Sequence, residues 1–322
     1  MKGIDTSLTV QISQHRTAIM GISILSIMLF HQYFTSVFPF DIFHNIGYWG
    51  VDVFLFLSGM GLVHSLKKNT ITTYYKRRLV RLAPSCILCG TIKYAIYLAF
   101  GSALDTLKDG LNFGVWTIAS LDLWFIHAII ILYAVSPVLY KSLSKWPYIS
   151  SLVILIIFLT NELTIRPGIG FDWLNPVGVT AWTLERLPVF SAGMMVSIGL
   201  WTIDSKKPLS FVFLLLAICL GLLSKTNFTF YGIQACLNLC LILGMPALIL
   251  LCIMMLNITP RLLHKAFVFL GEHSLELYLV HEFIFWSIKI SFEDANPYCL
   301  LVLSFMLSCM AAYCVKQVTN KI

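Results

Sequence analysis

The sequence predicts an all-α integral membrane protein, a bundle of about ten transmembrane helices with both termini in the cytoplasm. Two observations predict this fold class. Of the 322 residues, 58% are hydrophobic and only 11% are charged, whereas soluble domains carry about 25% charged residues. The mean hydropathy of +0.85 also leaves too little polar surface to cover a water-soluble domain. The bilayer is therefore the expected solvent.

Ten apolar runs mark the expected helices, within a single domain that covers residues 1–322 without a fused soluble domain. The first run, Thr17–Val37, is long and lacks a small-residue cleavage site, so we interpret it as a retained helix. The others are Tyr48–Leu66, Pro84–Ser102, Asp122–Tyr140, Pro147–Asn161, Leu187–Trp201, Pro208–Leu223, Cys236–Asn257, Leu275–Ile290 and Pro297–Lys316. The uncharged stretch 226–260 fits one span after a polar loop, or a re-entrant segment; we take the first.

Basic residues gather in alternate loops and set the orientation. The largest group lies between the second and third expected helices and consists of Lys67, Lys68, Lys76, Arg77, Arg78 and Arg81. The loops on the opposite side carry mainly acidic residues. Under the positive-inside rule, this pattern predicts an even number of spans and cytoplasmic termini. The net charge of +7 therefore reflects membrane topology, and we expect contact with membrane lipid and not with nucleic acid.

The nine cysteines lie within or at the edges of apolar runs. Cys86 and Cys89 have the spacing of a redox or metal motif, but a second pair and a polar setting are missing. We interpret them as helix-packing residues and predict neither a disulfide framework nor a metal site.

Ionisable residues inside a membrane are costly and mark candidate functional sites. Arg16 to His31 and Asp52 to Lys67 are each fifteen residues apart, which corresponds to about 22 Å of helix rise. The imidazole and the carboxylate thus reach the same outer level on antiparallel neighbours. We predict a His31–Asp52 pair in which the carboxylate orients the ring and strengthens it as a base. A hydrogen bond between two helices is the alternative use of His31.

Further candidates lie at the outer level. His127, in the fourth expected helix behind Trp124, projects to about the level of His31. Glu185 and Arg186 open the sixth expected helix from the outside, where Arg186 would orient an anionic or hydroxyl-rich group. The alternative for these two residues is an ion pair at the outer surface.

Three more ionisable residues are expected near the middle of the membrane. His281 and Glu282 lie in the ninth expected helix, and Lys93 lies at a similar depth in the third. A buried Lys93–Glu282 pair is a structural alternative to a catalytic use of either residue.

Three arginines, Arg77, Arg78 and Arg81, precede Pro84 at the cytoplasmic mouth of the third expected helix. Arg78 and Arg81 share a helix face. Guanidinium groups bind phosphate through paired hydrogen bonds, which suits a phosphorylated cytoplasmic ligand. Membrane topology or anionic lipid alone also explains such a cluster.

Several segments together resemble the acyltransferase family 3 membrane proteins, the O-acyltransferases that modify bacterial surface polysaccharides. The segments are Leu29–His31, Gly47–Gly59, Arg77–Pro84, Leu123–Phe125, Arg186–Gly193 and Leu270–His281. The likeness spans nearly the whole chain in order and spacing.

This resemblance implies a fold, a reaction and a location. It implies acyl-CoA, with acetyl the commonest acyl group, as a cytoplasmic co-substrate and no bound cofactor, with the CoA phosphates near Arg77, Arg78 and Arg81. It implies His31 as catalytic base or acyl carrier, a glycan or lipid-linked glycan as acceptor, and the inner (cytoplasmic) membrane as location. Either the bundle acylates the acceptor directly or a separate partner completes the transfer.

The chain departs from the family pattern at two positions. Met20 stands where the family often has an arginine eleven residues before the histidine, and Arg16, one turn below on the same face, is the expected substitute. Glu282 stands where a proline often follows the second histidine.

Two other classes of function remain open. In a transporter or flippase of lipid-linked sugars or small molecules, His31, Asp52, Lys93 and Glu282 would form a proton or substrate path. The arginine motif favours the acyltransferase, because a CoA donor requires it and a flippase does not. A non-catalytic assembly protein is the third class, and the presence of both His31 and Asp52 argues against it.

Overall fold

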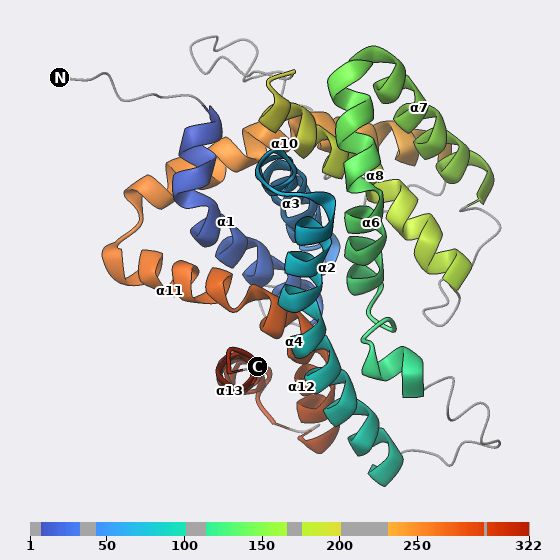
Figure 1. Ribbon diagram of the computed structural model, residues 1–322. Coiled ribbons are helices and arrows are strands. Elements are labelled where there is room, and N and C mark those ends of the chain that lie inside the picture. Colours follow the sequence, from blue (N-terminus) through green and yellow to red (C-terminus); the bar gives the residue numbers. More distant parts are fainter. Residues whose placement is uncertain are drawn as a thin grey trace.

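The computed structural model describes residues 8–32, 43–100, 114–165, 176–200, 231–292 and 295–321. These residues are almost entirely helical and contain no β-strand, which confirms the all-α prediction (Figure 1). The helices are α1 (Leu8–Phe30), α2 (Phe43–Ile46), α3 (Trp49–Lys68), α4 (Ile71–Phe100), α6 (Trp124–Lys145), α7 (Pro147–Thr160), the π-helical turn η2 (Asn161–Ile165), α8 (Pro176–Ile198), α10 (Tyr231–Ile258), α11 (Arg261–Glu272), α12 (Ser274–Ser291) and α13 (Pro297–Thr319).

Several of these helices are suited to a bilayer. Within the described ranges, five are long and apolar enough to cross a membrane: Trp49–Lys68, Ile71–Ala99, Trp124–Lys145, Pro147–Ile165 and Pro297–Thr319. A multi-pass membrane protein is therefore supported. About ten spans and cytoplasmic termini stay predictions, and the expected helix Pro208–Leu223 lies outside the described residues.

Some helix boundaries differ from the expected ones. α4 begins at Ile71 and not at Pro84, and α8 begins at Pro176 and not at Leu187. α11 occupies the segment between the expected helices Cys236–Asn257 and Leu275–Ile290. Hydropathy locates only the apolar part of a helix, whereas Lys and Arg are good helix formers, so polar turns extend a helix beyond the apolar run. As a result, the arginine motif is itself helical and Glu185 and Arg186 lie inside α8.

Helix α3 lies at the centre of the bundle, between α1 on one side and α6 and α8 on the other (Figure 1). It contacts α8 most closely through two glycines. A Cβ atom on Gly59 would lie 2.1 Å from the carbonyl oxygen of Phe190, and one on Gly193 would lie 2.0 Å from that of Phe56. Small residues of this kind let membrane helices pack backbone to backbone. α3 and α8 are therefore held as one rigid pair.

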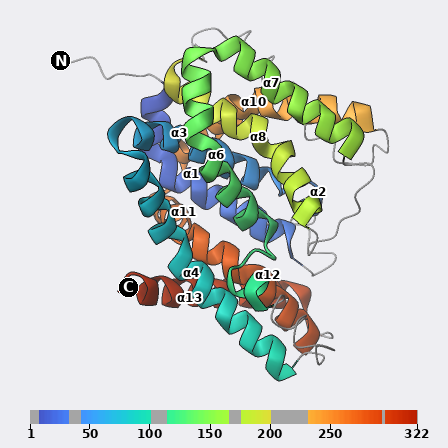
Figure 2. The same cartoon turned by 45° about the vertical axis from the view of Figure 1, so that its right-hand side comes forward.

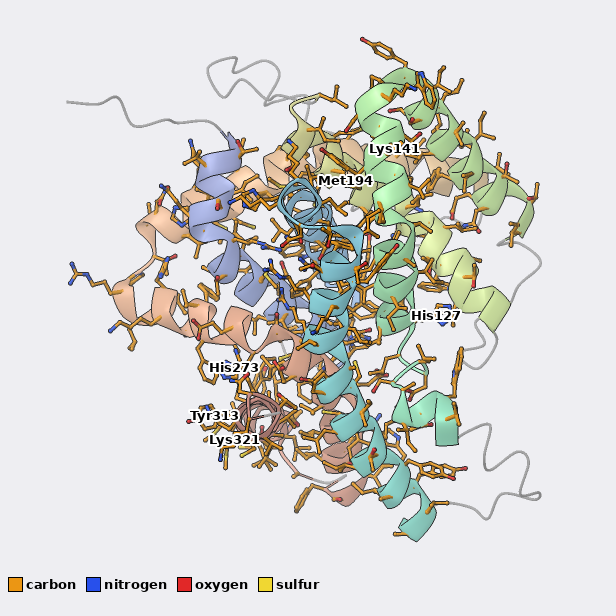
Figure 3. The ribbon with its side chains drawn as sticks, in the orientation of Figure 1. His127, Lys141, Met194, His273, Tyr313 and Lys321 are labelled. Carbon is orange, nitrogen blue, oxygen red and sulfur yellow. The ribbon has the colours of Figure 1, made fainter. Side chains whose placement is uncertain are left out.

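Helices α12, α13 and the far half of α4 form a second group that extends from this centre (Figure 2). The turn between α11 and α12 fixes this group, because the His273 ring lies 4.3 Å from the Phe269 ring and 5.9 Å from the Tyr313 ring (Figure 3). Asn296 starts α13 by accepting a hydrogen bond from the backbone N–H of Tyr298 at 2.9 Å. α12 is thus held between the bundle and α13.

Candidate functional site

The expected histidines His31 and His281 contact each other. His31 directly follows α1, and its ring Nδ1 lies 3.0 Å from the carbonyl oxygen of Ile27 and 3.1 Å from Nε2 of His281. His281, in the middle of α12, is only 1% exposed. The sequence placed His281 deeper than His31, but the two residues lie at the same level. They join α1 to α12 at a centre in which His281 is buried and His31 is half-buried.

Aromatic rings surround this pair of histidines. The His281 ring lies 5.7 Å from the Tyr278 ring and 6.1 Å from the Phe285 ring, and the His31 ring lies 4.9 Å from the Phe30 ring. A setting of this kind excludes water and strengthens any hydrogen bond formed inside it. The charge of Glu282 is also close enough to act on His31.

Asp52 forms an ion pair with Arg186, whereas the sequence predicted a pair with His31. The Oδ1 atom of Asp52 lies 3.3 Å from Nε of Arg186, and Nη1 of Arg186 donates to Oε1 of Glu185 at 3.0 Å. Asn238 donates to the same glutamate oxygen at 3.3 Å. All four residues are buried. Glu185 and Arg186 were expected to open a helix from the outside, with a surface ion pair as the alternative. They instead lie inside α8 and belong to a buried ion cluster between α3, α8 and α10.

The alternative of a buried Lys93–Glu282 pair is not what the structure shows for Lys93. Lys93 forms an ion pair with Asp122, which precedes α6. The Lys93 side chain is 34% exposed, so this pair lies near the edge of the described bundle and not in its core. Glu282 instead acts on the histidine centre.

Arg16 lies where α1 crosses α3. Its Nη2 donates to the carbonyl oxygen of Leu57 at 3.3 Å. Its guanidinium covers Gly61, where a Cβ atom would lie 2.9 Å from Nη2. In the part of the chain that the structure describes, Arg16 has no carboxylate partner, and the charges of Arg78 and Arg81 are close enough to repel its own. The structure thus gathers Arg16 with two arginines of α4.

Arg78 is held by aromatic faces. Its guanidinium carbon lies 5.7 Å from the ring centroids of both Tyr74 and Tyr133. Tyr74 is fully buried, and its hydroxyl is 2.5 Å from that of Ser136 on α6. Arg78 is therefore fixed without an acidic partner among the described residues. The third expected arginine, Arg77, is exposed on the surface of α4.

A cavity of about 60 Å³ lies between Arg81 of this cluster and Tyr278 of α12. Arg81 and Tyr133 line its polar part, and Phe54, Phe125 and Tyr278 line an apolar part. The Tyr278 ring in turn contacts the His281 ring. Met20, the position where the family often has an arginine, also lines the cavity. The cavity thus has a cationic side at Arg81 and an apolar side that includes Tyr278, the ring beside His281.

Two expected candidates lie elsewhere on α6. The His127 ring lies 5.7 Å from the Trp116 ring (Figure 3), and the Trp124 ring lies 5.6 Å from the Trp182 ring. Neither His127 nor Trp124 contacts the histidine pair. His127 was expected at about the depth of His31 in the membrane, but a similar depth on separate helices does not place two residues at the same site.

Sequence reasoning missed some members of these sites. Asn238 was hidden in an apolar run, although a carboxamide there is itself a signal of a buried polar contact. Tyr133 had no signal, because its role depends on the packing of α6 against α4. In the described residues, no group of three or more His, Cys, Asp or Glu side chains is arranged to hold a metal ion.

The apolar helices and the contact between His31 and His281 are now placed in the fold. The chain belongs to the acyltransferase domain family, which it matches over residues 18–316. The family therefore covers nearly the whole chain, as the resemblance predicted. Comparison with the curated proteins and with the solved structures finds no match.

Proposed function

We propose that this protein transfers an acyl group, most simply acetyl, from cytoplasmic acyl-CoA to a hydroxyl of a cell-surface or lipid-linked glycan at the inner membrane. The observation that carries the proposal is the cavity between Arg81 and Tyr278. Arg81, a member of the arginine cluster, lines this cavity, and so does Tyr278, whose ring lies 5.7 Å from that of His281. A cationic cluster and a reactive imidazole are the two parts that an acyl-CoA transferase needs.

The arginine cluster supports the choice of donor. Arg16, Arg78 and Arg81 are near one another and have no carboxylate partner among the described residues. Guanidinium groups left without acidic partners favour a polyanion, and the phosphates of CoA supply the matching charge. Exposed Arg77 adds to the positive field at the same helix. The apolar wall of Phe54 and Phe125 suits the pantetheine arm and the thioester.

His31 carries the chemistry in this proposal, by one of two routes. As a base, its imidazole takes the proton of the acceptor hydroxyl while the hydroxyl oxygen attacks the thioester carbonyl. The C–S bond breaks, and the CoA thiolate takes that proton from the imidazolium. As a carrier, the imidazole attacks the carbonyl first, and the C–S bond breaks to release the CoA thiolate. The acceptor hydroxyl oxygen then takes the acyl group from the imidazole, and the thiolate takes the hydroxyl proton. Either route converts one thioester and one hydroxyl into one ester and one CoA thiol.

The Asp52–Arg186–Glu185 cluster is the proposed acceptor end. Tyr48 links it to the histidine pair, because its ring lies 6.2 Å from that of Phe30 and the charges of Asp52 and Arg186 act on its hydroxyl. Carboxylates and a guanidinium suit the hydroxyl groups of a sugar. Asp52 thus has a proposed role in holding the acceptor and not in orienting His31.

The test is the ester-linked acyl content of cell-surface glycans, measured by mass spectrometry. A deletion strain is complemented with wild type, His31→Ala or the matched control His64→Ala, which replaces an exposed histidine of α3. We expect wild type and His64→Ala to restore the ester and His31→Ala to fail at equal membrane abundance. Unchanged acylation in the deletion strain, with altered export of a glycan or small molecule, would favour the transporter class.

A further inference from the structure

The two histidine rings are held by groups that decide where their protons lie. The Nδ1 atom of His281 lies 2.9 Å from the carbonyl oxygen of Leu277 and 3.0 Å from that of Tyr278. A carbonyl oxygen only accepts hydrogen bonds, so this nitrogen carries the ring proton. In the neutral ring, Nε2 of His281 is then an acceptor, and it faces His31.

The same argument fixes the second ring. The Nδ1 atom of His31 has two neighbours, the Ile27 carbonyl oxygen at 3.0 Å and Nε2 of His281 at 3.1 Å. Both are acceptors, so Nδ1 of His31 carries its proton and Nε2 keeps a lone pair. The other tautomer would turn a nitrogen lone pair toward two acceptors and would lose both hydrogen bonds at a half-buried position.

We infer that His281 is a positioning residue that holds His31 in the Nδ1–H tautomer and leaves the Nε2 lone pair of His31 for the substrate. This inference rests on the proposed role of His31 in acyl transfer. A carboxylate commonly orients a basic histidine, but here the nearby Asp52 is engaged by Arg186. A neutral imidazole accepts the same hydrogen bond without the cost of burying another charge.

The arrangement also serves the charged intermediate. When Nε2 of His31 takes a proton from the acceptor hydroxyl, Nδ1–H still donates to His281, so the positive charge is partly shared across the hydrogen bond. The charge of Glu282 acts on the same ring. Glu282 thus supplies the counter-charge, and His281 fixes the orientation and the tautomer of the His31 ring.

Three substitutions of His281 test whether His31 needs only a hydrogen-bond acceptor at the place of Nε2 or the whole imidazole ring. In His281→Gln, the side-chain amide oxygen reaches the place of Nε2 and accepts from His31. In His281→Asn, the shorter amide reaches only the place of Nδ1 and leaves His31 without its acceptor. His281→Leu provides no hydrogen-bonding atom at either place. The readout is the release of CoA thiol from acetyl-CoA by membranes that contain the native acceptor, with His31→Ala and His64→Ala alongside.

We expect His281→Leu and His281→Asn to lower kcat by roughly 10²- to 10⁴-fold, the contribution of a positioned base, with KM for acetyl-CoA nearly unchanged. His281→Gln should recover kcat to within about tenfold of wild type. Equal kcat values for the Gln and Asn variants, or full kcat in the Leu variant, would overturn the inference while the dependence on His31 still stood. Loss of that dependence would instead overturn the proposed function.

A spectroscopic test needs no change at position 281 and no turnover. In wild-type protein labelled with ¹⁵N-histidine, His31 is identified by the signal that disappears in His31→Gln. We expect the bonded-proton signature at Nδ1 of His31 and the shift of an unprotonated nitrogen at Nε2. The reverse pattern, with a proton on Nε2, would contradict the inference even if every position-281 variant failed to fold.

Discussion

Arg186, on the one hand, and Arg16 and Arg78, on the other, are stabilised in opposite ways. Arg186 is buried between Asp52 and Glu185, and the second carboxylate also accepts from Asn238. Arg78 instead lies over two tyrosine rings, and Arg16 donates to a backbone carbonyl. Neither Arg78 nor Arg16 has an acidic partner within the described ranges. The positive charge of Arg186 is therefore paired with carboxylates, whereas in the described residues the charges of Arg16 and Arg78 are not.

The difference separates an arginine whose charge the fold already pairs from arginines whose charge is open to an anionic donor. A buried cation that lost its carboxylates would be destabilising, so the Arg186 cluster must be assembled whole. Aromatic faces and carbonyls orient a guanidinium and leave its donors open for an anion. Substitutions in the two groups should therefore change different measurable properties, namely stability in the first and donor affinity in the second.

The largest effect is expected in the cluster of Asp52, Glu185 and Arg186. Arg186→Leu leaves two buried carboxylates without their cation and should destabilise the protein by about 3–5 kcal/mol. The measurement is thermal unfolding of the detergent-solubilised protein, with Arg261→Leu on the exposed start of α11 as control.

A combined variant sharpens the same test. Asp52→Asn and Glu185→Gln added to Arg186→Leu remove the unpaired charges and should recover much of the lost stability, because the penalty comes from uncompensated charge. If Arg186→Leu unfolds at the temperature of the wild type, the cluster is not structural and the comparison fails.

A smaller effect is expected in the cluster of Arg16, Arg78 and Arg81, and it should appear in the affinity for acetyl-CoA. Arg81→Gln removes one cation from the wall of the cavity and should weaken acetyl-CoA binding about tenfold, as loss of one charge-assisted phosphate contact would. The unfolding temperature should stay close to that of the wild type. Isothermal titration of the solubilised protein measures the affinity, with Arg261→Gln as the matched control.

The ligand offers a second control for Arg81→Gln. Acetyl-pantetheine keeps the thioester and arm of acetyl-CoA but lacks the nucleotide and its phosphates. The substitution should therefore leave acetyl-pantetheine binding unchanged. An equal loss for both ligands would mean that Arg81 shapes the cavity and does not bind phosphate.

The sequence predicted the residue types of the site better than their partners. Hydropathy and charge placement identified His31, Asp52, His281 and Arg186 as membrane residues that need an explanation. Depth counting then paired His31 with Asp52, because it treats each helix as perpendicular to the bilayer and starts it at a hydropathy boundary. α8 starts eleven residues earlier than expected, which places Arg186 beside Asp52. The His31–His281 contact depends on how α1 and α12 cross, and no pattern within a single helix encodes that crossing.

The smallest expected effect concerns the aromatic support of Arg78. Tyr133→Leu removes one of the two rings beneath its guanidinium and should weaken acetyl-CoA binding by about 2- to 5-fold, equivalent to the roughly 0.5–1 kcal/mol of an exposed cation–π contact. Tyr133→Phe keeps the ring face and should bind like the wild type. The backbone carbonyl of residue 133, which accepts from Tyr74 at 3.2 Å, is present in both variants, so any difference between them reports the ring. If both variants lose affinity equally, the Tyr133 hydroxyl supports donor binding, and Arg78 is held by Tyr74 alone.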